Sequence, residues 1–151
     1  MDDFSAKPGV PNAYELVGSD ANSIQPGKRP LSSMTPTIVL KNKKPFLVIG
    51  SPGGSTIITT TMQVILNVVV FGMDIKEAVS SPRFHSQWLP DMIMTEPRGL
   101  SKDVIKKLVS RGHTLTPYRW GYIGEANGIL IGENGFYGGG DTRGETSSAG
   151  Y

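Results

Sequence analysis

The chain has 151 residues, of which 38% are hydrophobic, and a formal net charge of +2. These values fit a single domain, residues 1–151, with a buried core, and the charge is too small to indicate nucleic-acid binding. The chain contains no cysteine, which excludes thiol catalysis, disulfides and cysteine metal sites. The two histidines, His85 and His113, have no convincing partners in the sequence, so we expect no metal site and no cofactor.

The first 30 residues predict an irregular segment. Proline or glycine recurs at positions 8, 9, 11, 18, 26, 27 and 30, which interrupts any long helix or strand. A loop of this length is uncommon in a compact domain unless it is functional or packs against something else. No basic stretch followed by an apolar one opens the chain, so we expect no signal peptide.

Helices and strands are expected after residue 30. In chain order they are a hairpin of strands 37–41 and 45–50, a helix 55–71 ended by Gly72, a short helix 75–80 capped by Asp74, strands 83–88 and 92–96, a helix 101–111 ended by Gly112, and late strands 114–117, 128–132 and 135–138, the last two joined by a turn at Asn134-Gly135. The basic cluster at residues 41–44 is predicted to be the hairpin turn.

The longest apolar run, residues 57–71, is too short to span a bilayer and contains three Thr, a Gln and an Asn. We therefore expect no membrane span and interpret the run as a buried helix. A pair of strands is the alternative, because β-branched residues are frequent in it.

The segment Gly50-Ser51-Pro52-Gly53-Gly54-Ser55 lies where a predicted strand passes into this predicted helix. Glycines at such a turn can present bare backbone N–H groups, and the helix dipole adds partial positive charge. This combination suits a negative oxygen: a phosphate, a carboxylate or the oxyanion of acyl transfer. The spacing fits neither the Walker loop nor the dinucleotide fingerprint. Taken alone, the segment is equally compatible with a tight turn that has no function.

Several segments, in this order and with consistent spacing, resemble one known family. They are Met1-Asp2-Asp3-Phe4, residues 28–39 (Lys-Arg-Pro-Leu-Ser-Ser-Met-Thr-Pro-Thr-Ile-Val), residues 50–55, Ser81-Pro82-Arg83-Phe84-His85 with Gln87-Trp88, and the ending from Asp141-Thr142-Arg143 to Ala149-Gly150-Tyr151. Together they resemble the small subunit of γ-glutamyltranspeptidases over essentially the whole chain. Thr142 stands where the family usually has a proline.

The resemblance implies an N-terminal-nucleophile hydrolase, an enzyme whose precursor cleaves itself before the Thr that becomes the nucleophile. It implies an α+β chain that forms part of an αββα four-layer sandwich, and a large subunit of the same precursor as its partner. The activity implied is transfer or hydrolysis of γ-glutamyl groups from small molecules such as glutathione, without a cofactor. A periplasmic or secreted location is implied for the parent protein.

Roles for individual residues also follow from the resemblance. The backbone of Gly53 and Gly54 would form the oxyanion hole. Ser32 and Ser33 would donate hydrogen bonds to the α-carboxylate of the glutamyl group, and Asp3 would hold its α-ammonium. Without the resemblance, the two serines fit a strand cap and Asp3 fits a frayed chain start.

In the family, the nucleophilic Thr lies upstream of the Met-Asp-Asp-Phe segment, so we expect this chain to be a C-terminal fragment of a small subunit that is inactive by itself. A sheet cut in this way would expose an edge and an apolar face, which predicts self-association. Two alternatives remain open: an acylase of the same fold, such as a cephalosporin-type acylase, and a non-catalytic module that binds anions or assists assembly.

Five other side chains have structural interpretations. His85 is expected to be packed in a strand, and His113 to lie on the surface after a helix. The two tryptophans, Trp88 and Trp120, are expected in the core or at an interface. Arg143, near Asp141, is expected to form a structural ion pair with the rest of the fold, with a mobile tail as the alternative.

Overall fold

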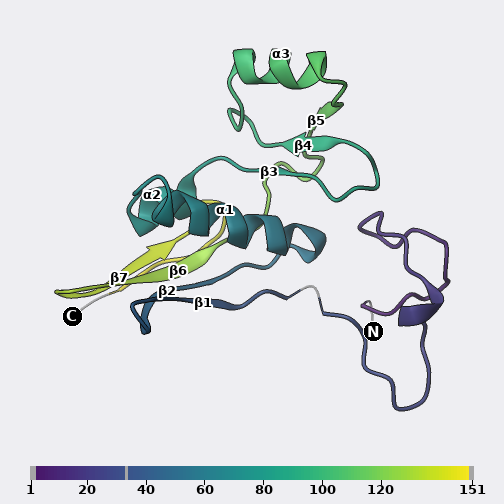
Figure 1. Cartoon of the computed structure of the whole chain (residues 1–151), viewed down its shortest axis with the longest axis horizontal. Helices are drawn as coiled ribbons and strands as arrows, with labels where there is room; N and C mark the ends of the chain where they lie inside the picture. The colour runs from purple at the N-terminus through teal and green to yellow at the C-terminus, as the bar shows by residue number, and fades with distance from the viewer. Residues whose placement is uncertain (1–2, 33, 150–151) are drawn as a thin grey trace.

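The computed structural model describes residues 3–32 and 34–149. Its largest unit is an antiparallel sheet in the order β1-β2-β6-β7. The strands are β1 (Thr37–Lys41), β2 (Lys44–Gly50), β6 (Asn127–Gly132) and β7 (Gly135–Gly140). Helices α1 (Ile57–Val69) and α2 (Ile75–Ser80) cover one face of this sheet (Figure 1). The expected α+β class is confirmed, and one helix layer on one sheet layer is the expected half of a four-layer sandwich.

Both predicted hairpins form, with small shifts in their turns. Asn42 and Lys43 connect β1 to β2 with φ of 53° and 63°, the left-handed values that a tight two-residue hairpin turn requires. The turn between β6 and β7 is Glu133-Asn134, not the predicted Asn134-Gly135, because Gly135 already belongs to β7.

The predicted helix after the glycine turn is confirmed, and the alternative pair of strands is wrong. A short 3₁₀ turn, η2 (Gly54–Thr56), precedes α1. The expectation of a buried helix is wrong for one of its sides, since Ile58, Met62 and Val69 are 53%, 47% and 54% exposed. Apolar composition predicted burial all round, but the described chain supplies a packing partner for only one side of α1.

The main core lies between α1, α2 and β2. Its buried residues are Leu47, Ile49, Val64, Val68, Ile75, Ala78, Val79 and Ala126. The predicted cap of α2 is confirmed as a capping box, in which Asp74 Oδ1 accepts from Glu77 N at 2.8 Å and Asp74 N donates to Glu77 Oε2 at 3.3 Å. Glycine at position 139 lets α2 lie close to β7, because a Cβ there would stand 2.9 Å from the Ile75 carbonyl oxygen.

A second, smaller sheet holds β3 (Phe84–His85), β4 (Ile93–Thr95) and β5 (Leu115–Pro117) in that order. The strands predicted at residues 83–88 and 92–96 are therefore present but much shorter. β4 and β5 are parallel, because α3 (Lys102–Ser110) forms the crossover between them. Ser101 precedes α3 as predicted, but its hydroxyl donates to Asp103 Oδ1 at 2.6 Å and does not cap the helix backbone.

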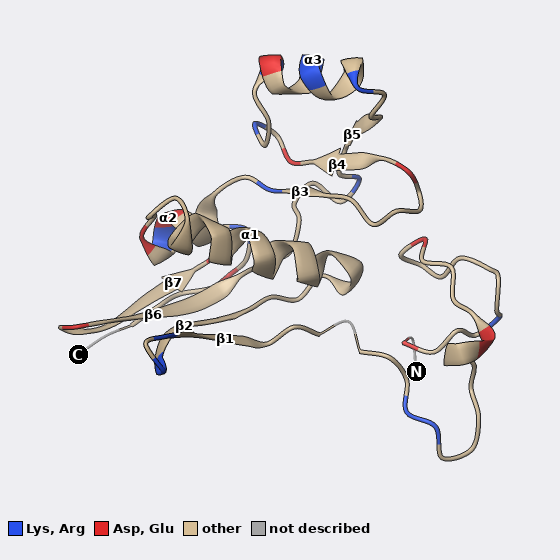
Figure 2. Ribbon diagram, in the orientation of Figure 1, with Lys and Arg blue, Asp and Glu red and all other residues tan. Residues whose placement is uncertain are grey.

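The face of the large sheet that α1 and α2 do not cover carries an apolar row. Ile38 on β1, Val48 on β2 and Ile129 on β6 are paired in register across the three strands, and all three are exposed. Figure 2 shows charged residues at the β1–β2 turn, on α2 and α3, along the amino-terminal segment and around the small sheet, whereas α1 carries none. In the described part of the chain, no helix is both long and apolar enough to cross a membrane.

Four buried charged side chains join the C-terminal end of β7 to the rest of the fold. They are Arg83, Glu96, Asp141 and Arg143. Arg83 Nη2 lies 2.7 Å from Asp141 Oδ2. Arg143 pairs with both carboxylates, at 2.8 Å to Asp141 Oδ1 and 2.6 Å to Glu96 Oε2. The predicted structural ion pair of Arg143 is thus confirmed, and its partners are Asp141 and Glu96, in a cluster whose two positive and two negative groups balance.

Backbone N–H groups also donate hydrogen bonds to the carboxylate oxygens of this ion cluster. Ile123 N donates to Glu96 Oε1 at 2.6 Å, and Ala126 N donates to Asp141 Oδ2 at 2.7 Å. Burial alone would raise the pKa of Asp141, but the hydrogen bonds from Arg143 and Arg83 outweigh it and hold that pKa below its ordinary value. Burial lowers the pKa of Arg83, although Asp141 opposes this effect.

We predict that Asp141→Asn destabilises the fold by about 3–5 kcal/mol at neutral pH, because it leaves buried arginine charge uncompensated. Since the pKa of Asp141 is lowered by folding, the carboxylate stabilises the fold above its unfolded pKa of about 3.9, and this contribution is lost as the pH falls through the folded pKa. Urea unfolding at neutral pH and at about pH 3 measures both effects. The exposed carboxylate Asp91 gives the control, Asp91→Asn, and an equal loss for both variants would contradict the prediction.

Candidate functional site

The glycine turn between β2 and α1 has the geometry that the sequence predicted. Gly53 and Gly54 have φ of 138° and 58°, values that residues with a Cβ rarely adopt. The turn closes through Thr56, whose N and Oγ1 both donate to the carbonyl oxygen of Gly53, at 3.1 and 2.9 Å. Since that carbonyl is held by Thr56, the turn has a fixed shape.

The backbone N–H groups of Gly53 and Gly54 have no acceptor among the hydrogen bonds of the described residues. They lie at the amino end of the η2–α1 helical segment, where unpaired N–H groups and the helix dipole give partial positive charge. The turn is therefore able to bind a negatively charged oxygen.

The ring of Tyr14 lies directly against Gly54. A Cβ on Gly54 would overlap the ring atoms Cε1 and Cζ, so only glycine fits beneath this side chain. Tyr14 comes from the irregular amino-terminal segment, which stands beside the amino end of α1 (Figure 1). A residue 40 positions earlier in the chain thus covers the turn.

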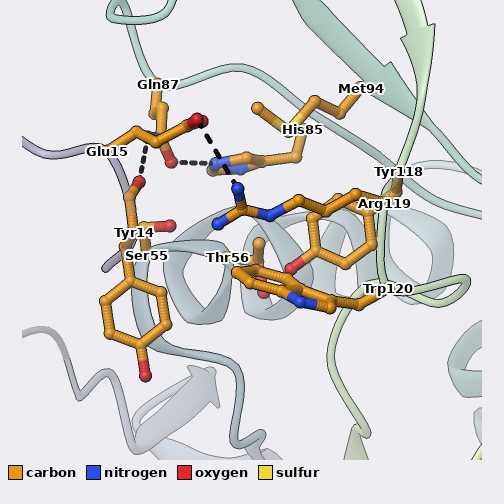
Figure 3. A pocket seen from close by; sticks show the side chains of 10 residues that line it. All are labelled: Tyr14, Glu15, Ser55, Thr56, His85, Gln87, Met94, Tyr118, Arg119 and Trp120. Carbon is orange, nitrogen blue, oxygen red and sulfur yellow. Dashed lines mark hydrogen bonds and ion pairs between the residues drawn. The ribbon is translucent and has the colours of Figure 1, made fainter. Parts of the chain in front are cut away.

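A small pocket adjoins the turn (Figure 3). Its lining residues are Tyr14, Glu15, Ser55, Thr56, His85, Gln87, Met94, Tyr118, Arg119 and Trp120. Arg119 stacks over the Trp120 ring at 4.1 Å, and the Trp120 ring meets the Tyr14 ring edge-on at 6.5 Å. Of the two places expected for Trp88 and Trp120, the core is wrong, because they are 80% and 56% exposed, and a place at an interface stays a prediction.

The two charged side chains that line this pocket form an ion pair with each other. Arg119 Nη1 lies 3.5 Å from Glu15 Oε1, and both side chains are about half exposed, so this ion pair stabilises the structure weakly. Burial raises the pKa of Tyr118, and a hydrogen bond with Thr56 opposes that rise. Among residues 3–32 and 34–149, no group of three or more His, Asp or Glu side chains is placed to hold a metal ion.

Asp3 and Ser32, both predicted to bind substrate, belong to two backbone segments that one side chain connects. Asn22 Nδ2 donates to the carbonyl oxygen of Asp3 at 2.6 Å, and Asn22 Oδ1 accepts from Leu31 N at 3.0 Å. The hydroxyl oxygen of Ser32 accepts from Met34 N at 3.2 Å, a local turn contact. Ser33 lies outside the described residues.

Sequence reasoning missed Tyr14, Asn22, Gln87 and Arg119 as residues of the site. None belongs to a recognisable catalytic pattern, and three of them act through contacts between segments more than 70 residues apart in sequence, such as Gln87 Nε2 to Tyr14 O at 2.7 Å and Arg119 Nη2 to Ala13 O at 3.0 Å. Two signals were available: the improbable length of the irregular segment, and the place of Gln87 in one of the segments that carry the family resemblance.

Known proteins resemble this chain over its whole length. The pattern of the gamma-glutamyltranspeptidase family matches residues 1–151. The glutathione hydrolase proenzyme of Escherichia coli is 50% identical over 153 residues, which cover 100% of this chain and 26% of that protein. This chain therefore spans about a quarter of the length of that relative.

Solved structures agree with the sequence comparison. A gamma-glutamyltranspeptidase from Helicobacter pylori superposes with a TM-score of 0.89 at 55% identity, covering 95% of this chain and 78% of the solved one. The enzyme from Pseudomonas nitroreducens, solved in complex with L-DON, gives a TM-score of 0.90 at 42% identity, covering 100% and 79%. With the fold and the glycine turn described above, these likenesses show that the chain belongs to the gamma-glutamyltranspeptidase family.

Proposed function

We propose that this chain supplies the oxyanion hole and part of the donor site of an enzyme that transfers or hydrolyses γ-glutamyl groups, with glutathione-type molecules as donors. The observation that carries the proposal is the turn of Gly53 and Gly54, whose N–H groups have no acceptor among the described residues and lie at a helix amino end. Membership of the family supplies the reaction class. The large subunit of the same precursor is the proposed partner, and a periplasmic or secreted location is proposed on the family resemblance.

In this mechanism a Thr hydroxyl oxygen, supplied from outside these 151 residues, attacks the γ-carbonyl carbon while its proton passes to the α-amine of the same Thr. The carbonyl oxygen becomes an oxyanion that accepts hydrogen bonds from Gly53 N and Gly54 N. The bond to the leaving amine then breaks, and the amine takes the proton. Water or an acceptor amine repeats the attack on the acyl-enzyme and releases the γ-glutamyl group.

The donor's amino-acid end is proposed to bind Asp3, Ser32 and Ser33. A carboxylate suits the α-ammonium, and two hydroxyl donors suit the α-carboxylate. The contacts of Asn22 support this assignment, because they tie the backbone of Asp3 to that of Leu31, the residue before Ser32.

We propose that this segment belongs to a longer protein, which we call the proenzyme. In the proenzyme, we expect Gly53→Ala to lower kcat by about 10²–10³-fold. The new Cβ would stand 2.5 Å from Thr56 Oγ1 and would tilt the N–H donors. Release of p-nitroaniline from γ-glutamyl-p-nitroanilide measures the rate, and the isolated chain, which we expect to be inactive, serves as the blank. Gly112→Ala is the matched control, since Gly112 also has positive φ but open space around it. A rise in KM alone would point to ground-state binding.

We expect Asp3→Ala in the proenzyme to weaken γ-glutamyl donors far more than des-amino glutaryl donors, because the latter lack the ammonium group. The ratio of kcat/KM values for the two donors gives the result. Equal losses for both donors would assign Asp3 a structural role and would favour an acylase that does not recognise an amino-acid end.

We also expect the isolated chain to self-associate. The exposed row of Ile38, Val48 and Ile129, beside the unpaired edge of β1, offers an apolar surface to a second copy. Sedimentation velocity should show dimers or larger species, and Val48→Lys should reduce them. A compact monomer for the unmodified chain would contradict this prediction.

A further inference from the structure

A row of hydrogen-bonded side chains runs from α1 to the segment that covers the glycine turn. Thr59 Oγ1, on the first turn of α1, lies 2.8 Å from His85 Nδ1. His85 Nε2 lies 2.8 Å from Gln87 Oε1, and Gln87 Nε2 donates to the Tyr14 carbonyl oxygen at 2.7 Å. The row therefore joins the helix behind the turn to the residue in front of it, and Figure 3 shows its part from His85 through Gln87 to Tyr14.

The direction of these hydrogen bonds is fixed by the amide of Gln87. Its Nε2 donates to two carbonyl oxygens, those of Tyr14 and Leu89, at 2.7 and 3.0 Å, so the Oε1 atom must face the histidine. Because Oε1 only accepts, His85 Nε2 carries the proton and donates. In the neutral ring, Nδ1 is then an acceptor for the Thr59 hydroxyl at 2.8 Å, and it shares that one proton with the Thr56 carbonyl oxygen, which lies 3.1 Å from Thr59 Oγ1.

His85 is well suited to hold Gln87 and poorly suited to react. As predicted it is packed, with 2% exposure, and both ring nitrogens already have partners. No ring nitrogen is left to take a proton from a substrate. The histidine thus orients the amide, and the amide holds the backbone of Tyr14.

The held segment has few other anchors. Arg119 Nη2 donates to the Ala13 carbonyl oxygen at 3.0 Å, and its half-exposed ion pair with Glu15 adds little. Glu15 has a φ of 63°, an unfavourable value for a residue with a Cβ. A segment with this local strain needs tertiary contacts to stay in place, and the Gln87 amide provides a direct one at Tyr14 itself.

We propose that Gln87, oriented by His85 and Thr59, is a positioning residue that holds Tyr14 against the oxyanion turn. It acts on substrate only through Tyr14, whose ring covers Gly54. The catalytic consequence rests on the proposed function above, whereas the positioning of the segment does not. Loss of the Gln87 donor should loosen residues 12–16 and weaken donor binding while leaving the N–H groups of the turn intact.

The test compares Gln87→Glu with Gln87→Met in the proenzyme. Both variants keep the side-chain length and remove the donor. Glu also still accepts from His85, but it directs a carboxylate oxygen at the carbonyls of Tyr14 and Leu89. If Gln87 positions Tyr14, Gln87→Glu should disturb the Tyr14 segment more than Gln87→Met does, although Glu resembles Gln more closely in shape. Gln25→Glu is the control, because Gln25 is exposed and its amide contacts only Ser23 Oγ, at 3.5 Å, among described residues.

Hydrogen exchange of residues 12–16 is the first measurement and needs no activity. We expect faster exchange there in both Gln87 variants, fastest in Gln87→Glu, with the rest of the sheet unchanged. The second measurement is kinetic: KM for the γ-glutamyl donor should rise about tenfold, the equivalent of one lost hydrogen bond of about 1.4 kcal/mol, with a smaller change in kcat.

Exchange at residues 12–16 equal to that of the unmodified proenzyme in both variants would overturn the proposal. So would a greater effect of Met than of Glu, which would indicate simple packing. If the unmodified proenzyme does not turn over γ-glutamyl donors, the proposed function fails, and the exchange measurement still decides the role of Gln87.

Discussion

The buried ion cluster of Arg83, Glu96, Asp141 and Arg143 is the interaction on which the rest of the structure depends. It joins the end of β7 to the loop after α2 and to the end of β4. Charges are costly to bury, and they are tolerated here because each carboxylate accepts hydrogen bonds from an arginine and from a backbone N–H. The ion cluster thereby connects the large sheet to the small sheet, and the side-chain amide of Gln63 on α1, which bonds to the backbone of Phe84 on β3, adds to this connection.

The same cluster fixes the surroundings of the glycine turn. Glu96 and Asp141 hold the backbone of Ile123 and Ala126, and the intervening Gly124 lies against Gly53, where a Cβ on Gly53 would stand 3.4 Å from Gly124 Cα. Glu125 N donates to Ser51 Oγ at 3.0 Å, which anchors the start of the turn. The glycine turn is thus supported from behind by these contacts, and this kind of support lets a site bind charge without rearranging.

In front of the turn, the structure is assembled from the least regular part of the chain. Residues 3–32 contain one short 3₁₀ turn, η1 (Asp20–Asn22), and are organised by side chains that bond to distant backbone. Asn22 joins the Asp3 and Leu31 segments, and Gln87 and Arg119 hold residues 13 and 14. The site therefore has two different sides. The side behind the glycine turn belongs to the packed fold, whereas the side in front of it is the amino-terminal segment, which a few polar contacts hold in place.

The sequence by itself determined the local elements and the family. Glycines at the turn, Asp74 before α2 and the alternation in the hairpins act within a few residues, so they are readable from the order of amino acids. Only the tertiary structure decided which side of α1 is buried, how short β3 and β4 are, and which side chains meet at the site. The contacts of Asn22, Gln87 and Arg119 join segments up to 106 residues apart. No local propensity encodes such contacts, because they exist only once the chain has folded.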